Sequence, residues 1–539
     1  MSTKVLGAAS TSNPITRNLN QAPATDSKWM VSIAVVFGVL MTTIDSSVVN
    51  VALPVIQGNV GATQQEITWI STAYLISVVI LMPLTHWLSA TFGRKRVYLT
   101  SLVVFTGASL MCGFSHTLNA LIFWRVIQGF GAGTLQPLAQ AIFREAFPSN
   151  QQGIAMGIFG FLVLFGPAMG PTLGGWITDN YNWPWIFLIN IPIGIVGFFI
   201  ALRHLRDPAY EINMIKPKVD GIGIGLLAVG LATLQTVLEQ GEAVDWFASN
   251  FIVIFSIIAA VALVAFVFWE LRSPQPAVNL RILKDRTFAS ATVIGGVLGV
   301  GLFASLFLLP QFMQLLLGFT ATQSGLSLMP RSLVMMFMMP VGGIFYNRIG
   351  AKPMIAVGLC LSAYSQWIMG HFTLQTGAGD ILVPQLIQGV GFALVFVALS
   401  TAALANIPRT NMTSATGLNN LIRQMGGSFG TAYIVVLLTQ KLAQARADLA
   451  THTDTANYAF MQRLQGITAG FHAAGDPPDI AHSAALRAMD GLISKQAAML
   501  AYDYLFLWIG LLFIMCLPLV LLLKNPTSNA EPAPVVHAD

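Results

Sequence analysis

Residues 125–132 read Arg-Val-Ile-Gln-Gly-Phe-Gly-Ala, and residues 385–392 read Gln-Leu-Ile-Gln-Gly-Val-Gly-Phe, so one short pattern returns after 260 residues. A second pair of stretches lies at nearly the same distance, because residues 86–95 return after 257 residues as residues 343–352. Repetition at one nearly constant distance indicates two copies of a structural unit. The repeats therefore predict a chain built from two equivalent halves.

The composition shows which solvent surrounds these halves. The chain has 539 residues, of which 55% are hydrophobic and 9% are charged, whereas a soluble protein carries about 25% charged residues. The apolar runs last about twenty residues or more, which is the length of a membrane-spanning helix and about twice that of a barrel strand. We predict an all-α polytopic membrane protein with fourteen spans. They are expected at residues 30–54, 66–89, 96–115, 119–142, 152–176, 185–204, 220–239, 251–271, 289–315, 322–347, 352–372, 380–405, 412–439 and 498–523.

The repeats assign these spans to two halves of six, with two additional spans between the halves. The repeated pattern falls in the fourth span of each half once the seventh and eighth spans are set aside. The predicted organisation comprises an N-terminal tail at 1–29, an N-terminal half at 30–204, two linker spans with their connectors at 205–287, a C-terminal half at 288–523 with a long loop at 440–497, and a C-terminal tail at 524–539.

The basic residues indicate the orientation of the chain. The net charge is +5, from 27 Lys and Arg against 22 Asp and Glu. If both termini lie on one side of the membrane, nineteen of the 27 basic residues lie there and five lie in the loop 440–497. Cytoplasmic loops carry the excess of Lys and Arg, so we expect both tails to be cytoplasmic and the long loop to be extracytoplasmic. This distribution argues against a nucleic-acid partner.

Charged residues inside membrane spans are costly and mark functional sites. Asp45 lies fifteen residues into the first span, and Arg125 lies about six residues into the fourth. Arginine keeps its charge, whereas a carboxyl group held between burial and a nearby cation can bind and release a proton. We predict that these two residues form a proton-coupling pair. The alternative is a fixed salt bridge that holds the helices together.

The fifth span repeats glycine and proline at a spacing of four residues. The members of this motif are Gly166, Pro167, Gly170, Pro171, Gly174 and Gly175. Small residues at this spacing share one face of a helix and let another helix approach closely, and each proline removes one backbone donor. We predict a bendable helix that packs tightly against a neighbour.

These motifs resemble those of the fourteen-span drug:proton antiporters of the major facilitator superfamily, the EmrB/QacA type. Residues 45–54 resemble the first-span motif of that family, residues 125–133 its fourth-span motif and residues 166–175 its antiporter motif. The resemblance runs from about residue 30 to residue 523 and implies the major facilitator fold, with two six-helix halves plus two additional helices. It also implies that Asp45 and Arg125 couple protons to the export of amphipathic toxic compounds, by alternating access, across the cytoplasmic (inner) membrane of a bacterium.

The repeated loops after the second and tenth spans are expected to form a cytoplasmic gate. Its predicted residues are Gly93, Arg94, Lys95, Arg348 and Gly350. The family motif has a glycine and an acid where this chain has His86 and Ala90, and Asn347 replaces the acid in the second copy. The gate therefore lacks its usual carboxylates.

Two further arginines lie inside spans of the second half. Arg331 and Arg423 lie about nine and eleven residues into the tenth and thirteenth spans, with no acid close in sequence. Each needs Asp45, backbone carbonyls, water or an anionic substrate as its partner, so we predict a cavity that favours neutral or weakly acidic amphiphiles. The alternative is that both are structural cations. Other residues expected to line the cavity are Asn50, Trp69, Tyr74, Gln136, Gln311, Gln314, Gln388, Phe396 and Asn419.

The loop 440–497 is about 58 residues long and contains amphipathic or helical stretches at 442–449, 458–464 and 484–500. The resemblance implies that such a loop docks a periplasmic adaptor, a membrane fusion protein. The alternative is a cap over the cavity. The partners expected from the sequence are therefore membrane lipids, small amphipathic substrates and this adaptor.

The sequence also excludes several functions. It has no GxxxxGK[ST] loop and no soluble domain that could hold ATP, and its three cysteines form no CxxC pair. We therefore expect no enzyme activity, no metal and no cofactor, with the proton gradient as the energy source. Two alternatives stay open: a dedicated proton-coupled exporter of one endogenous lipid or metabolite, and a non-transporting membrane sensor on the same fold.

Overall fold

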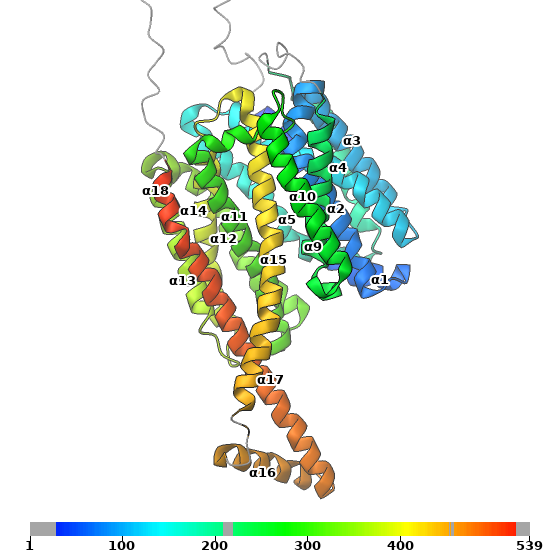
Figure 1. Cartoon of the computed structure of the whole chain (residues 1–539), viewed down its shortest axis with the longest axis vertical. Coiled ribbons are helices and arrows are strands. Elements are labelled where there is room, and N and C mark those ends of the chain that lie inside the picture. Colours follow the sequence, from blue (N-terminus) through cyan, green and yellow to red (C-terminus); the bar gives the residue numbers. More distant parts are fainter. Residues whose placement is uncertain (1–27, 209–218, 452, 454–456, 524–539) are drawn as a thin grey trace, which may run out of the picture.

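The computed structural model describes residues 28–208, 219–451, 453 and 457–523. Of the two predicted tails, only Lys28 and Trp29 fall within these residues. The described chain forms a bundle of long helices that run side by side (Figure 1). Both ends of the described chain lie at one end of this bundle, called here the terminal end, and a pair of helices extends beyond the other end, called here the stalk end.

The helices of the bundle agree with the fourteen spans predicted from the sequence. Twelve helices of the described chain are long and apolar enough to cross a membrane, and α4 and α13 complete the set. The elements are α1 (Lys28–Val60), α2 (Gln64–Phe92), α3 (Arg94–Gly113), α4 (Leu118–Ala146), α5 (Gln152–Asn180), α6 (Trp185–Leu188) continued by α7 (Asn190–His204), α9 (Gly221–Gln240), α10 (Asn250–Arg272), α11 (Arg286–Gln311), α12 (Ala321–Ile349), α13 (Ala351–Met369), α14 (Ala378–Ala403), α15 (Met412–Ala450), and α17 (Pro478–Met515) continued by α18 (Leu517–Leu522).

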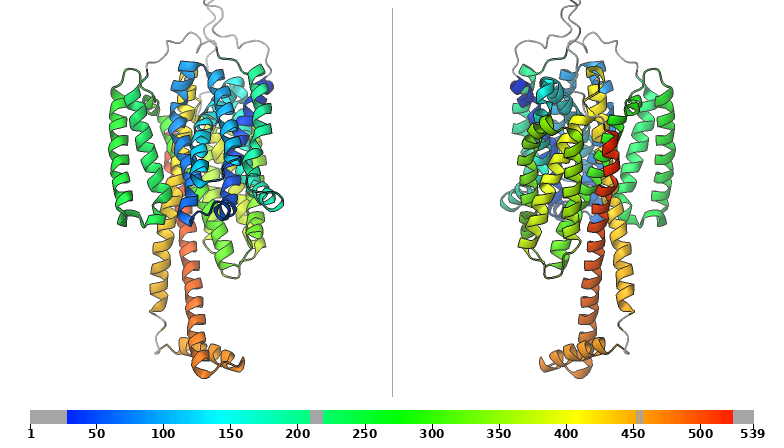
Figure 2. Two further views of the ribbon diagram at one scale, coloured as in Figure 1. Left: turned by 90° about the vertical axis from the view of Figure 1, so that its right-hand side faces the viewer. Right: turned by 90° about the vertical axis from the view of Figure 1, so that its left-hand side faces the viewer.

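These helices form the two six-helix halves and the additional pair that the repeats predict. Helices α1 to α7 pack on one another, as do α11 to α18, and the halves meet where α5 packs on α12 and where α2 packs on α15. The hairpin of α9 and α10 lies at the edge of the bundle (Figure 2), where α9 contacts both α2 and α15. The hairpin therefore covers the contact between α2 and α15.

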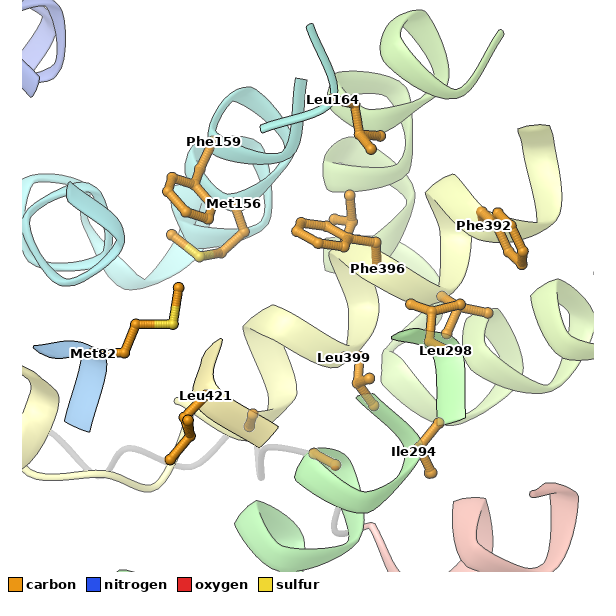
Figure 3. Close-up of a cluster of buried hydrophobic side chains, with 14 of the residues drawn as sticks. Met82, Met156, Phe159, Leu164, Ile294, Leu298, Phe392, Phe396, Leu399 and Leu421 are labelled. Atoms are coloured by element: carbon orange, nitrogen blue, oxygen red, sulfur yellow. The ribbon is translucent and has the colours of Figure 1, made fainter. Parts of the chain in front are cut away.

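A buried apolar cluster lies where the halves meet. Figure 3 shows Met82 and Phe159 of the first half near Phe396, Leu399 and Leu421 of the second. All five belong to one continuous set of buried side chains. Because dispersion contacts drive helix association in lipid, this cluster holds the two halves together at their centre.

The long segment 440–497 is helical over most of its length, rather than an irregular loop. Helix α15 continues to Ala450 and α17 already begins at Pro478, so the two run beyond the bundle side by side, with α16 (Tyr458–Ala473) across their tip (Figures 1 and 2). We call these extensions and α16 the stalk. The helices that contain the predicted spans 412–439 and 498–523 therefore continue beyond these spans at the stalk end.

Few contacts hold the stalk together. Arg446 on α15 pairs with Asp490 on α17 at 2.8 Å on the surface. Leu464 of α16 is buried against Ala485 and Met489 of α17. Exposed ion pairs add less than about 1 kcal/mol, so the small apolar cluster under α16 is the main contact that orders the tip.

Candidate functional site

Asp45 and Arg125 meet inside the first half. The Nη1 atom of Arg125 on α4 donates to Oδ2 of Asp45 on α1 at 2.6 Å, and the two side chains are 1% and 0% exposed. Gln128, one turn further along α4, donates from Nε2 to Oδ1 of Asp45 at 2.8 Å and accepts from Arg125 Nη1 at 2.8 Å. The glutamine therefore bridges the two charges.

Helices α3 and α7 close the other side of this pair. Asn190, the first residue of α7, donates from Nδ2 to Asp45 Oδ1 at 3.0 Å and to Ser109 Oγ at 3.1 Å. Ser109 on α3 donates in turn to the Phe187 carbonyl oxygen at 2.8 Å. Asp45 thus receives hydrogen bonds from both α4 and α7. A change in its charge would alter the strength of its bonds to both helices.

Arg125 has partners besides the carboxylate. Its Nε donates to the Ile70 carbonyl oxygen on α2 at 3.1 Å, and its guanidinium carbon lies 4.1 Å from the ring centroid of Tyr74. A cation over an aromatic face is stabilised by the ring quadrupole. Arg125 is therefore also held by partners other than Asp45.

The glycine motif of α5 packs against the segment of α1 that carries Asp45. A Cβ atom at Gly166 would overlap the backbone of Thr43, and one at Gly170 would overlap the side chain of Ser47. The two contacts lie on either side of Asp45 in the sequence. Further along, Gly174 contacts Val48, whereas Gly175 has open space. The motif thus allows α5 to pack closely against the acid-bearing helix.

The second half holds a similar polar cluster without an acid. Gln388 donates from Nε2 to Ser305 Oγ at 3.2 Å, as does Gln366 at 2.8 Å, and Arg331 Nη1 donates to Gln388 Oε1 at 3.1 Å. Gln388 and Ser305 lie 260 residues after Gln128 and Asp45. The four members of this cluster, Ser305, Arg331, Gln366 and Gln388, are buried. Arg331 Nη2 has no hydrogen-bond partner in the described chain.

Arg423 lies at the interface of the halves. Its guanidinium carbon is 5.0 Å from the Phe396 ring centroid, and its Nη2 donates to Asn420 Oδ1 at 2.5 Å. Asn420 donates in turn to Gln140 Oε1 on α4 of the first half at 2.7 Å. Arg423 and Phe396, each predicted to line the cavity, therefore lie together, and Asn420 and Gln140 extend this cluster.

The other predicted cavity residues do not gather at one place. Asn50 is exposed and accepts from Ser71, Gln311 accepts from Tyr502 at 3.5 Å, and Asn419 is buried near Gly295. Tyr74 lies under Arg125. Trp69 and Gln136 are half-buried, and Gln314 is exposed, without a hydrogen bond in the described chain.

The predicted gate residues lie at the terminal end of the bundle. Arg94 forms an ion pair with Glu145 at 2.9 Å and reaches Thr413 Oγ1 of the second half at 3.4 Å. Gly93 and Gly350 occupy the turns before α3 and α13 with φ of +89° and +84°, a conformation that favours glycine. Arg348 is exposed.

A carboxylate from outside the motif contacts the predicted gate residues. Asp207, in the connector after α7, accepts from the Lys95 backbone N–H through Oδ1 at 2.7 Å and lies against Gly93. Lys95 itself donates from Nζ to the Leu202 carbonyl oxygen at 2.6 Å. The sequence places Ala90 where the motif has its acid, and a residue 112 positions after Lys95 supplies a carboxylate to the same loop.

The halves are also joined at the terminal end by backbone contacts. Asn347 Nδ2 donates to the Asn150 carbonyl oxygen at 2.7 Å, and Arg144 Nη2 reaches the Leu404 carbonyl oxygen at 3.4 Å. Nearer the middle of the bundle, Thr416 donates to the Pro137 carbonyl oxygen at 3.0 Å. Among the described residues, no group of three or more His, Cys, Asp or Glu side chains could hold a metal ion.

Two equivalent helical halves, a buried acid–arginine pair and an interface that joins the halves at one end together define a membrane transporter. The chain belongs to the major facilitator superfamily, because the family model described as Major Facilitator Superfamily matches residues 35–431. It is a transporter and not an enzyme, and the family predicted from the motifs is confirmed.

Relatives of known name are transporters of the same group. The multidrug export protein EmrB of Escherichia coli (strain K12) is 33% identical over 442 residues, which cover 81% of this chain and 86% of the relative. The fatty acid resistance protein FarB of Neisseria gonorrhoeae is 32% identical over 499 residues, covering 92% and 96%. The structures of the human organic anion transporter MFSD10 and of the proton:xylose symporter XylE have TM-scores of 0.57 and 0.56 at 14% and 13% identity. The matched regions cover 91% and 90% of this chain, and 100% and 94% of the MFSD10 and XylE chains. They share the fold.

Proposed function

We propose that this chain exports amphipathic compounds, including drugs, in exchange for protons across the cytoplasmic (inner) membrane of a bacterium. The observation that carries the proposal is the buried pair of Asp45 and Arg125, which joins helices of the first half. The names of the relatives, multidrug export protein and fatty acid resistance protein, support export as the direction. The proton gradient supplies the energy, and no cofactor takes part.

In this proposal Asp45 binds and releases the proton. When the carboxylate is ionised, Arg125, Gln128 and Asn190 all donate to it. When a proton neutralises Asp45, the ion pair weakens, Arg125 keeps its bonds to Gln128 and to the Ile70 carbonyl, and α1 becomes free to repack on the glycines of α5. Proton binding is thereby converted into helix movement.

The arrangement of the halves supports alternating access. Arg94 and Thr413, and Asn150 and Asn347, connect the halves at the terminal end. We assign this end to the cytoplasm, with both tails there, because the basic loops lie at it. Separation of these contacts would then expose the interface of the halves to the cytoplasm.

We propose that the substrates are neutral or weakly acidic amphiphiles. Arg423 lies at the junction of the halves with an aromatic ring on one side and two amides on the other. No carboxylate of the described chain forms an ion pair with Arg423 or with Arg331. An anionic headgroup would pair with the guanidinium of Arg423 while its apolar part packs on Phe396 and the neighbouring apolar cluster.

We further propose that the stalk docks a periplasmic membrane fusion protein. The stalk extends beyond the bundle at the end opposite the terminal end (Figure 2). Two antiparallel helices with a third across their tip offer an extended helical surface, which suits a partner helix better than a cap over the cavity. Membrane lipids contact the outer faces of the bundle.

The proposal is tested in reconstituted proteoliposomes with an imposed pH gradient. The probe is a fluorescent neutral amphiphile, whose own distribution does not depend on pH. We expect the unmodified protein to accumulate the probe against its gradient and Asp45→Asn to reach only the level of empty liposomes. Accumulation by Asp45→Asn at the unmodified rate would contradict the proposal.

A further inference from the structure

A second carboxylate lies among the membrane-spanning helices, outside the site described above. Glu239 is near the stalk end of α9, in the linker hairpin, and is partly buried against α15. In the described chain no Lys, Arg or His forms an ion pair with it. A carboxylate inside a membrane span without a cation is a candidate functional group.

The partners of Glu239 are neutral. Gln235, one turn before it, donates from Nε2 to Glu239 Oε1 at 2.8 Å and to Ser428 Oγ at 2.9 Å. Ser428 on α15 donates to the same carboxylate oxygen at 3.4 Å. These three side chains form a small polar cluster between the linker hairpin and the second half.

The cluster can satisfy both charge states of the carboxyl group. In the ionised state Gln235 and Ser428 act as donors. Gln235 is fully buried, and its Oε1 has no hydrogen-bond partner in the described chain. Rotation of the amide by half a turn would present this oxygen as an acceptor, and a protonated Glu239 would then donate to it. The unpartnered Oε1 of Gln235 is thus available to accept a hydrogen bond from the neutral carboxyl group of Glu239.

The position of the cluster connects it to the movement of the halves. One residue beyond Glu239, Gln240 donates to Thr68 and Thr72 of α2 at 3.0 and 3.1 Å. Helix α9 is therefore bonded to the first half through Gln240 and to the second half through Ser428. A proton on Glu239 removes the charge that Ser428 donates to, while the bonds to α2 stay.

The neighbouring charged groups of the described chain do not bond to Glu239. Near its level, the charged or titratable groups on the elements packed against α9 are Glu66 and Tyr74 on α2, Arg423 and Tyr433 on α15, and Glu242 and Asp245 in the turn that follows α9. Glu270 of α10 lies at the opposite end of the hairpin, near Asp220. None of them forms a hydrogen bond or an ion pair with Glu239 in the described chain.

We propose that Glu239 is a second proton-binding site, which binds and releases its proton as α15 moves against the linker hairpin. The proposal rests on the proton-coupled antiport proposed above and adds a second titrating group to it. The transporter would then couple conformational change to protons at two places, one inside the first half and one between the linker hairpin and the second half.

Infrared spectroscopy of the full chain in lipid bilayers tests this proposal without a substrate. The C=O stretch of protonated carboxyl groups is recorded between about pH 5 and pH 9 for the unmodified protein, Asp45→Asn, Glu239→Gln and the matched control Glu242→Gln. Glu242 is exposed and lies three residues after Glu239. We expect a pH-dependent band that Glu239→Gln removes and that Asp45→Asn and Glu242→Gln retain.

The outcomes separate this proposal from the role of Asp45. A band that Glu239→Gln removes but that does not change with pH, or a Glu239→Gln spectrum equal to that of the unmodified protein, would overturn the second site, whatever Asp45→Asn shows. If Glu239→Gln does not fold, Ser428→Ala is used instead. That variant is expected to change the pH at which the Glu239 band appears, and an unchanged pH would overturn the proposal.

Discussion

Asp45 on α1 and Ser305 on α11 occupy equivalent positions of the two halves, 260 residues apart, and each accepts a hydrogen bond from the equivalent glutamine, Gln128 or Gln388. The fold thus repeats the polar cluster and keeps the acid in one copy only. In the second copy the arginine comes from α12, as Arg331. The first half therefore holds an ion pair at this position, whereas the second half presents a cation that forms no ion pair in the described chain.

Removal of Arg125 is expected to destabilise the protein more than removal of both charges. Arg125→Ala leaves a buried carboxylate without its cation, which costs about 3–5 kcal/mol in a buried pair. The double variant Asp45→Asn with Arg125→Gln leaves neutral amides that can bond to each other. Thermal unfolding in detergent should therefore give a lower Tm for Arg125→Ala than for the double variant. The reverse order of Tm would show that the pair contributes no electrostatic stabilisation.

A methyl group on the glycine face of α5 is expected to stop transport where it meets α1. Gly166→Ala places a Cβ against the Thr43 backbone, so α5 has to move away from the acid-bearing helix. Gly175→Ala is the matched control, because it adds the same group in open space. We expect Gly166→Ala to lower both the Tm and the transport rate and Gly175→Ala to leave the rate unchanged. Equal rates for the two variants would argue against close packing in this motif.

Substitution of Arg423 is expected to change substrate preference. Hydrogen bonds to a charged group contribute about 1.5–3 kcal/mol, so Arg423→Gln should reduce export of hydrophobic weak acids by roughly ten- to a hundredfold. Export of neutral amphiphiles should fall much less. Arg409→Gln, at an exposed position before α15, serves as the control and should behave as the unmodified protein. Equal losses for acidic and neutral probes would make Arg423 a structural cation.

A covalent link between Asn150 and Asn347 is expected to block the transporter. The side chain of Asn347 donates to the Asn150 carbonyl oxygen at 2.7 Å across the two halves. Cysteines at both positions, in a chain whose Cys112, Cys360 and Cys516 are replaced by serine, should crosslink under mild oxidation. Transport should stop and should return after reduction. The single-cysteine variants are the control, and full activity of the crosslinked protein would show that this end does not open.

The sequence predicts the helices and the charged pair because both depend on local composition. An acid and an arginine within apolar runs are conspicuous, so Asp45 and Arg125 are found without a structure. Gln128, Ser109 and Asn190 are uncharged and resemble many other polar residues of the spans, although Gln128 lies one turn from Arg125. Only the packing of α1 against α3, α4 and α7 shows that these three surround the acid.

Residues that act over long sequence distances could not be predicted. Asp207 supports the turn at Gly93 from a connector beyond α7, and no periodicity relates the two. In the described chain, the linker acid Glu239 bonds to the second half only through Ser428, 189 residues away in the sequence. The sequence predicts helical stretches within 440–497 but not that two of them continue the flanking spans, because hydropathy marks the part of a helix that lies in lipid and says nothing of its continuation into water.

The central claim is that Asp45 exchanges a proton when substrate binds. The most direct measurement is proton release from the purified, detergent-solubilised protein on addition of hydrophobic weak acids, with a matched control for the proton that each acid brings. The account predicts release by the unmodified protein and by Ser305→Ala, which changes the equivalent residue of the second half, and no release by Asp45→Asn. Equal release by Asp45→Asn and the unmodified protein would contradict the account and make the pair of Asp45 and Arg125 a fixed salt bridge.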